Sequence, residues 1–128
     1  MRITAARLQP YTLPLKIEWQ SAAGTLSVRS GWLIRLETDS GLIGYGECAP
    51  LPSHGSEDPA AAERGLNQSV AALPGQWVEA ALAELTAAAH ATPAARTAVE
   101  TALLDLLSQQ AGIPLANYLC QQECRRSV

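Results

Sequence analysis

The chain has 128 residues, a formal net charge of −3 and a hydrophobic fraction of 48%, much of it alanine, so we expect one domain with a modest core. Its eight arginines and one lysine are scattered among twelve acidic residues without a basic cluster, which argues against a nucleic-acid partner. No apolar run is long enough to predict a transmembrane helix, and the N-terminus leads into strand-like sequence rather than a signal peptide, so we expect no membrane partner and a cytoplasmic setting.

The first part of the chain is predicted to contain a strand and a long loop. Residues 2–13 mix apolar and polar positions and are expected to form a strand that ends at Pro14, because proline cannot donate to the ladder. Residues 19–31 are small and polar, with two glycines and three serines, and predict a mobile loop. Long loops in compact domains often bind ligands or close over them.

A β-hairpin is expected next. Residues 32–38 alternate between apolar and polar side chains, which is the pattern of a half-buried strand. Residues 39–41 read Asp-Ser-Gly and predict a tight turn, after which residues 42–48 return as the partner strand. Gly44 and Gly46 lie inside this strand and do not open a helix, so they predict a close backbone approach or a β-bulge rather than dinucleotide binding.

The rest of the chain is predicted to be helical. Residues 49–55 contain two prolines and a glycine and are expected to be irregular. Asp58 is the predicted N-cap, and Pro59 the first residue, of a helix that runs to about residue 73. A second helix is expected over residues 78–89.

Thr92 and Pro93 repeat the cap-then-proline signature and open a third helix, which ends at Gly112. A short turn is expected over residues 115–119. The apolar positions of the third helix recur at helical spacing and predict a buried stripe of Ala95, Val99, Ala102, Leu103, Leu106 and Leu107. The predicted fold class is α+β, a three-stranded antiparallel sheet followed by a three-helix bundle packed on one face.

The two histidines are weighed as candidates for chemistry. His54 lies beside Ser53 and close to Glu57 and Asp58, but no nucleophile-elbow sequence surrounds the serines. We expect it to be either a solvated loop residue or a substrate contact. His90 is interpreted as a last-turn residue favoured by the helix dipole.

The three cysteines, Cys48, Cys120 and Cys124, are interpreted as free thiols. Cys120 and Cys124 would share one face of a helix, but the chain has no CxxC motif, which disfavours a zinc site. Glu47 is either a strand-end hydrogen-bond acceptor or a solvated charge. None of these residues is a catalytic signature by itself.

Two strings of sequence resemble a known family. Residues 41–52, GLIGYGECAPLP, are similar to the end of the sheet in the muconate-lactonizing branch of the enolase superfamily. Residues 93–119, PAARTAVETALLDLLSQQAGIPLANYL, are similar to that branch's long helix and its Gly-x-Pro-Leu turn. The resemblance covers essentially the whole chain, and GECAPLP together with Arg29-Ser30-Gly31 looks most like the o-succinylbenzoate synthases.

The resemblance implies that residues 1–119 form an enolase-like N-terminal capping domain and residues 120–128 a linker toward a TIM barrel that is absent from the chain. Two loops of such a cap reach the active site, and they correspond to residues 19–31 and 48–58. The substrate contacts expected in these loops are Ser21, Gly24, Leu51, Ser53 and His54. The implied partners are a small-molecule carboxylate substrate and the missing barrel domain.

The chemistry of the resembled family removes a proton next to a carboxylate, using a lysine base and Mg²⁺. It requires a Lys-x-Lys pair, three acidic metal ligands and a further lysine. This sequence has a single lysine, Lys16, and three aspartates. Asp39 is assigned to a turn, Asp58 to a helix N-cap and Asp105 to a helix. We therefore expect no catalytic and no metal-binding residue here. Mg²⁺ would belong to the full-length parent enzyme, and the chain alone is expected to bind none and to be inactive.

The expected parent is an o-succinylbenzoate synthase, a lyase of menaquinone biosynthesis. The alternative parent is a dipeptide epimerase or N-acylamino-acid racemase. A function of another class also stays open, in which the isolated domain is a non-catalytic binding or assembly module. Its barrel-facing surface would then be exposed, and we expect self-association through it.

Overall fold

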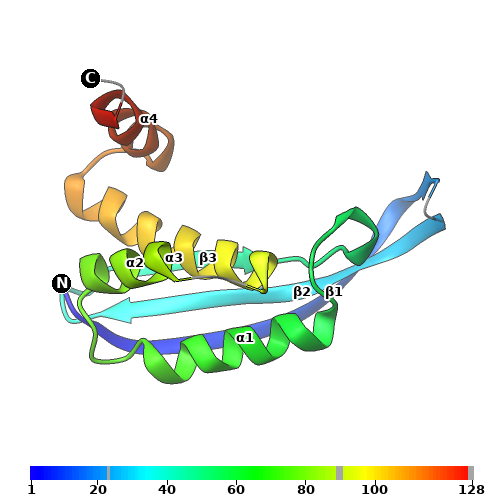
Figure 1. Cartoon of the computed structure of the whole chain (residues 1–128), viewed down its shortest axis with the longest axis horizontal. Coiled ribbons are helices and arrows are strands. Elements are labelled where there is room, and N and C mark those ends of the chain that lie inside the picture. Colours follow the sequence, from blue (N-terminus) through cyan, green and yellow to red (C-terminus); the bar gives the residue numbers. More distant parts are fainter. Residues whose placement is uncertain (23, 89–90, 127–128) are drawn as a thin grey trace.

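The computed structural model describes residues 1–22, 24–88 and 91–126, with side chains as far as residue 121. Strands come first and helices follow (Figure 1). The strands are β1 (Ile3–Ser21), β2 (Gly24–Thr38) and β3 (Ile43–Cys48); the helices are the 3-10 helix η1 (Pro52–His54), α1 (Pro59–Ala72), α2 (Val78–Ala87), α3 (Pro93–Ala111) and α4 (Leu115–Arg126). The sheet has the order β1-β2-β3 with antiparallel neighbours, which confirms the predicted α+β class.

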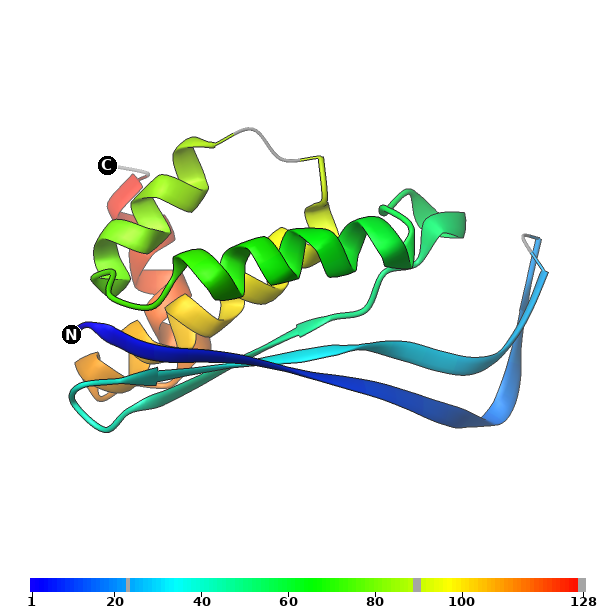
Figure 2. The ribbon, with the colours of Figure 1, turned by 90° about the horizontal axis from the view of Figure 1, so that it is seen from below.

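The helices α1 and α3 cover one face of the sheet (Figure 2). On that face Ile34 and Leu36 are fully buried, whereas Leu33 on the opposite face is 40% exposed, as the alternation predicted. The stripe predicted on α3 is buried against the sheet and makes up much of the core. The turn after β2 contains Gly41 with a φ of 82°, which also confirms its prediction.

Helix α3 approaches the sheet closely because β3 has glycines where the two backbones meet. A Cβ atom at Gly44 would lie 2.5 Å from the carbonyl oxygen of Ala102. One at Gly46 would collide with the carbonyl oxygen of Ala98. The close backbone approach predicted for these two glycines is therefore confirmed.

The predicted helix ends are found at most positions. Asp58 caps α1 by accepting a hydrogen bond from the amide of Ala61 at 2.8 Å, with Pro59 as the first helical residue. Gly112 ends α3 in the left-handed region with a φ of 71°. Helix α2 ends at Ala87, and residue 89, where its end was predicted, lies outside the described residues.

The predictions for residues 2–31 are partly wrong. Strand β1 does not end at Pro14 but continues to Ser21, and the expected loop over residues 19–31 is mostly the β1–β2 hairpin, in which Trp19 pairs with Leu26. Proline is tolerated because β1 is an edge strand. The hairpin extends beyond the helices (Figures 1 and 2), so even its large apolar side chains are exposed, Ile17 to 84% and Trp19 to 51%. A strand with no buried face lacks the period-2 signal that identifies strands.

The predicted bundle of three helices is also incomplete. The turn expected over residues 115–119 is the start of α4, which continues to Arg126 and so includes most of the expected linker 120–128. Pro114 directly precedes this helix, a position where its missing N–H costs no helical hydrogen bond. The domain boundary at residue 119 stays a prediction. None of the described helices is long and apolar enough to cross a bilayer.

Candidate substrate-binding site

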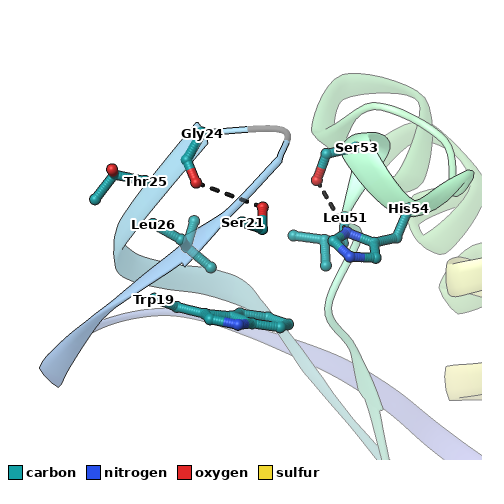
Figure 3. Close-up of a pocket in the computed structure, with 8 residues that line it drawn as sticks. All are labelled: Trp19, Ser21, Gly24, Thr25, Leu26, Leu51, Ser53 and His54. Atoms are coloured by element: carbon teal, nitrogen blue, oxygen red, sulfur yellow. Dashed lines mark hydrogen bonds between the residues drawn. The ribbon is translucent and has the colours of Figure 1, made fainter.

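A pocket of about 160 Å³ opens between the end of the β1–β2 hairpin and the segment that follows β3 (Figure 3). The hairpin contributes Trp19, Ser21, Gly24, Thr25 and Leu26, and the second segment contributes Leu51, Ser53 and His54. All five residues named from the sequence, Ser21, Gly24, Leu51, Ser53 and His54, therefore line one pocket although they come from two separate segments. That they contact a substrate stays a prediction.

Three further residues that line the pocket, Trp19, Thr25 and Leu26, were not predicted from the sequence. The register of the hairpin explains two of them, because Trp19 pairs directly with Leu26 across the two strands. The sequence offered one signal, the large aromatic side chain of Trp19 beside a stretch of small polar residues. Because residues 19–31 were predicted to be an irregular loop, the strand pairing that brings Trp19 to Leu26 was not expected.

Two aromatic rings form one wall of the pocket. The indole of Trp19 and the imidazole of His54 lie 5.8 Å apart between centroids, with 23° between their planes. The hydroxyl of Ser53 lies within hydrogen-bond distance of Nδ1 of His54, at 3.1 Å. This arrangement joins the hairpin to η1: His54 is exposed to solvent, and its ring stacks on the indole of Trp19.

The carboxylates nearest to His54 in the sequence are used to cap helices. Glu57 accepts hydrogen bonds from the amides of Ala94 and Ala95 at 2.8 and 3.2 Å, at the N-terminus of α3. Asp58 caps α1. Neither completes a Ser–His–acid arrangement with Ser53 and His54. Thr92 is the N-cap residue of α3 and Pro93 its first residue, as predicted, but the side chain of Thr92 makes no capping hydrogen bond. The carboxylate of Glu57 accepts from the first amides of α3 instead.

Arg29 fastens the two sides of the pocket together. From β2, its Nη1 donates to the carbonyl of Pro50 at 3.1 Å and its Nη2 donates to the carbonyl of Ala49 at 2.9 Å. Both carbonyls belong to the segment that continues into Leu51, whose amide donates to the hydroxyl of Ser56 at 2.5 Å. A guanidinium can reach two adjacent carbonyls with one planar group, which a lysine cannot do. The segment is thus held by hydrogen bonds at both ends of its turn.

At the end of β3, burial is the main cause of two raised pKa values. Burial, with the negative charges of Glu57 and Glu47, raises the pKa of the Cys48 thiol from 9.0 to about 11. Burial and the adjacent carboxylate of Glu47 also raise the pKa of the Tyr11 phenol. Cys48 therefore stays a protonated thiol at neutral pH, a form that is neither a nucleophile nor a good metal ligand. Cys48 and Cys120 are both free, as predicted.

Among the described residues, no group of three histidine, cysteine or acidic side chains lies close enough to hold a metal ion. The predicted places of the aspartates are confirmed. In the turn, Asp39 accepts from the amide of Arg2 at 2.9 Å, and Asp105 on α3 accepts from the amide of Tyr45 at the same distance. The interpretations of His90 and of the Cys124 side chain lie outside the described residues.

The sequence of this chain matches a known protein family and several of its members. Residues 3–120 match the N-terminal domain of the mandelate racemase / muconate lactonizing enzyme family. An o-succinylbenzoate synthase from Thermosynechococcus vestitus is 38% identical over 95 residues, covering 72% of this chain and 26% of that protein. An aromatic dipeptide epimerase from Herpetosiphon aurantiacus is 32% identical over 117 residues, covering 88% of this chain and 33% of that protein.

Solved structures show the same fold. The L-Ala-D/L-Glu epimerase from Bacillus subtilis, in a substrate-liganded complex, superposes with a TM-score of 0.83 at 27% identity, covering 93% of this chain and 34% of that one. A dipeptide epimerase from Enterococcus faecalis, complexed with Mg and the dipeptide L-Leu-L-Tyr, gives a TM-score of 0.78 at 28% identity, covering 90% and 33%. This chain spans about a third, or less, of the length of these relatives.

Proposed function

This chain belongs to the mandelate racemase / muconate lactonizing enzyme family of the enolase superfamily and corresponds to the N-terminal capping domain of that family. We propose that it closes over the substrate of a larger Mg²⁺-dependent enzyme. The observation that carries the proposal is the pocket itself. Five residues expected to contact substrate come from two segments and line one cavity between the end of the β1–β2 hairpin and the segment after β3 (Figure 3). A lid that excludes water and selects a substrate needs this kind of surface.

The proposal divides binding from chemistry. The described residues of this chain offer no three-ligand metal site, and the aspartates serve as backbone acceptors. We therefore assign Mg²⁺ and the proton-abstracting base to residues outside this chain. The contribution of the cap is to hold one end of a small carboxylate substrate, through the side chains around Trp19 and His54, while the reacting end faces the rest of the enzyme.

The proposed parent reaction is that of an o-succinylbenzoate synthase, a lyase acting in the cytoplasm in menaquinone biosynthesis. The 38% identity to such an enzyme supports it. A dipeptide epimerase or related N-acylamino-acid racemase is the second candidate. It is supported by relatives that match more of the chain, such as the aromatic dipeptide epimerase with 88% coverage.

The test is an assay of the complete gene product that contains this chain. The purified protein would be supplied with Mg²⁺ and assayed for o-succinylbenzoate formation and for epimerisation of a panel of dipeptides. We expect one of the two activities, lost on chelation with EDTA and restored by Mg²⁺. A product without either activity, or one whose activity is indifferent to EDTA, would contradict the proposed function.

A further inference from the structure

We propose that the pocket receives an uncharged six-membered ring of the substrate, which stacks on the indole of Trp19. This statement depends on the proposed function, because it names the part of the substrate that the same pocket would hold. Three properties of the pocket support the ring: the charge of its described lining residues, the shape of its walls and its volume.

Charge is the first consideration. None of the eight described lining residues is an aspartate, glutamate, lysine or arginine. Three charged residues of the adjoining segments are already engaged, since Arg29 donates to two backbone carbonyls and Glu57 and Asp58 cap helices. A carboxylate or ammonium group entering the pocket would lose hydration and gain no opposite charge, which is costly. An uncharged group avoids that cost.

Shape is the second consideration. Trp19 is 51% exposed, and its indole lies flat across the base of the pocket in Figure 3, with Leu26 above it. The imidazole of His54 continues the aromatic wall at a centroid distance of 5.8 Å, and Leu51 adds an apolar side. Aromatic rings prefer offset-stacked or edge-to-face partners at this range of distances. The two aromatic rings, with Leu26 and Leu51, therefore offer a flat ring a continuous aromatic and apolar surface to pack against.

Volume is the third consideration. The cavity of about 160 Å³ is close to the cavities of about 150 Å³ that admit one benzene molecule. Trp19 is not the only half-exposed tryptophan among the described residues. Trp77 is 50% exposed as well, but it lines no part of this pocket, and the guanidinium of Arg2 lies over its ring at 5.0 Å. Trp77 is thus a matched control for Trp19.

The experiment is an NMR titration of the ¹⁵N-labelled 128-residue chain with four small probes. Two carry an uncharged ring, benzamide and N-acetyl-L-phenylalanine amide, and two carry a charge, N-acetyl-L-glutamate amide and N-acetyl-L-lysine amide. We expect saturable shifts at the indole N–H of Trp19 and the amides of Gly24 and His54, with the charged probes binding at least roughly tenfold more weakly. Tighter binding of the phenylalanine probe than of benzamide would indicate a ring carried by a peptide, and the reverse a ring on a non-peptide acid.

Variants make the test specific. Trp19→Leu keeps apolar volume but removes the stacking face, and should weaken the ring probes by about tenfold, whereas Trp77→Leu should leave their affinity unchanged. Leu51→Lys adds a cation to the pocket and should reverse the preference toward the glutamate probe. Equal binding of charged and ring probes, or full binding by Trp19→Leu, or no saturable shift near Trp19, would overturn the proposal.

The ring-binding test and the activity test of the full-length enzyme can fail independently of each other. An active, Mg²⁺-dependent full-length enzyme whose cap binds no ring would refute the ring alone. A cap that binds the ring within an inactive full-length product would refute the lid function alone.

Discussion

Arg29 offers the most informative perturbation of the pocket, because one side chain connects β2 to the segment that carries Leu51, Ser53 and His54. Its two hydrogen bonds reach the carbonyls of Ala49 and Pro50 at 2.9 and 3.1 Å, and Pro50 is buried. Arg29→Met keeps the length and the apolar stem of the side chain but removes both donors. It therefore tests the hydrogen bonds rather than the packing.

The expected magnitude follows from the bonds that are lost. A hydrogen bond from a charged donor contributes about 1.5–3 kcal/mol, and partial exposure of Arg29 to solvent reduces that figure. A total loss of about 1.5–3 kcal/mol is therefore reasonable for the pair. Confined to one segment, this loss would raise the population of locally open states by roughly ten- to a hundredfold.

The assay is amide hydrogen exchange at the turn that Arg29 holds. The amides of His54 and Gly55 donate to the carbonyls of Leu51 and Pro52 at 2.9 and 3.1 Å, so they report opening of η1. We expect faster exchange at both amides in Arg29→Met, with little change in α3. Arg29→Lys should be intermediate, because an ammonium cannot serve both carbonyls with the same geometry.

The control is Arg7→Met, since Arg7 is 69% exposed and meets Glu37 at 3.6 Å, a pair expected to contribute little. Unchanged exchange at His54 and Gly55 in Arg29→Met would refute the role assigned to Arg29. An equal acceleration in Arg7→Met would show that the effect is not specific to the pocket.

The remaining predictions concern packing, ionisation and assembly. Gly46→Ala should destabilise the fold by about 1–3 kcal/mol in urea denaturation, because the added methyl meets the carbonyl of Ala98, whereas Gly65→Ala, with 3.0 Å to its nearest neighbour, should cost much less; equal losses would contradict this account of the α3–β3 contact. Burial raises the pKa of Cys48 to about 11, so the stability it contributes is present below pH 9 and is lost as the pH rises toward about 11; Cys48→Ala should show a smaller decline between pH 8 and pH 10.5, and an identical decline would refute that cause. Analytical ultracentrifugation should detect concentration-dependent self-association of the isolated chain, and a monomer at the highest concentration would oppose the assembly hypothesis.

The core could be predicted because burial leaves a pattern in the sequence. The fully buried Ile34 and Leu36 alternate with exposed or half-buried neighbours, and the α3 stripe repeats at helical spacing, so both the sheet and its covering helix were identified. Gly44 and Gly46 could be interpreted physically because a glycine inside a strand indicates that another backbone approaches closely.

The hairpin could not be predicted in the same way. Residues 17–22 and 24–26 lie in the part of the hairpin that extends past the helices (Figure 2), and all of them except Leu26 are exposed, so burial imposes neither a helical nor a strand periodicity on the sequence. The five candidate site residues were found through a family resemblance, whereas Trp19 and Leu26 needed the strand register that brings them together. The cap formed by Glu57 on α3 joins residues 37 and 38 positions apart, a distance at which local capping rules give no signal.

The central claim is that this chain selects the substrate while the metal and the reacting groups lie elsewhere in the enzyme. The most direct test measures kcat/KM and Mg²⁺ affinity of the complete gene product with and without the substitution Trp19→Ala. The account predicts that kcat/KM falls by at least about tenfold while the Kd for Mg²⁺ stays the same. An unchanged kcat/KM, or a loss of Mg²⁺ affinity that accounts for the whole effect, would contradict it.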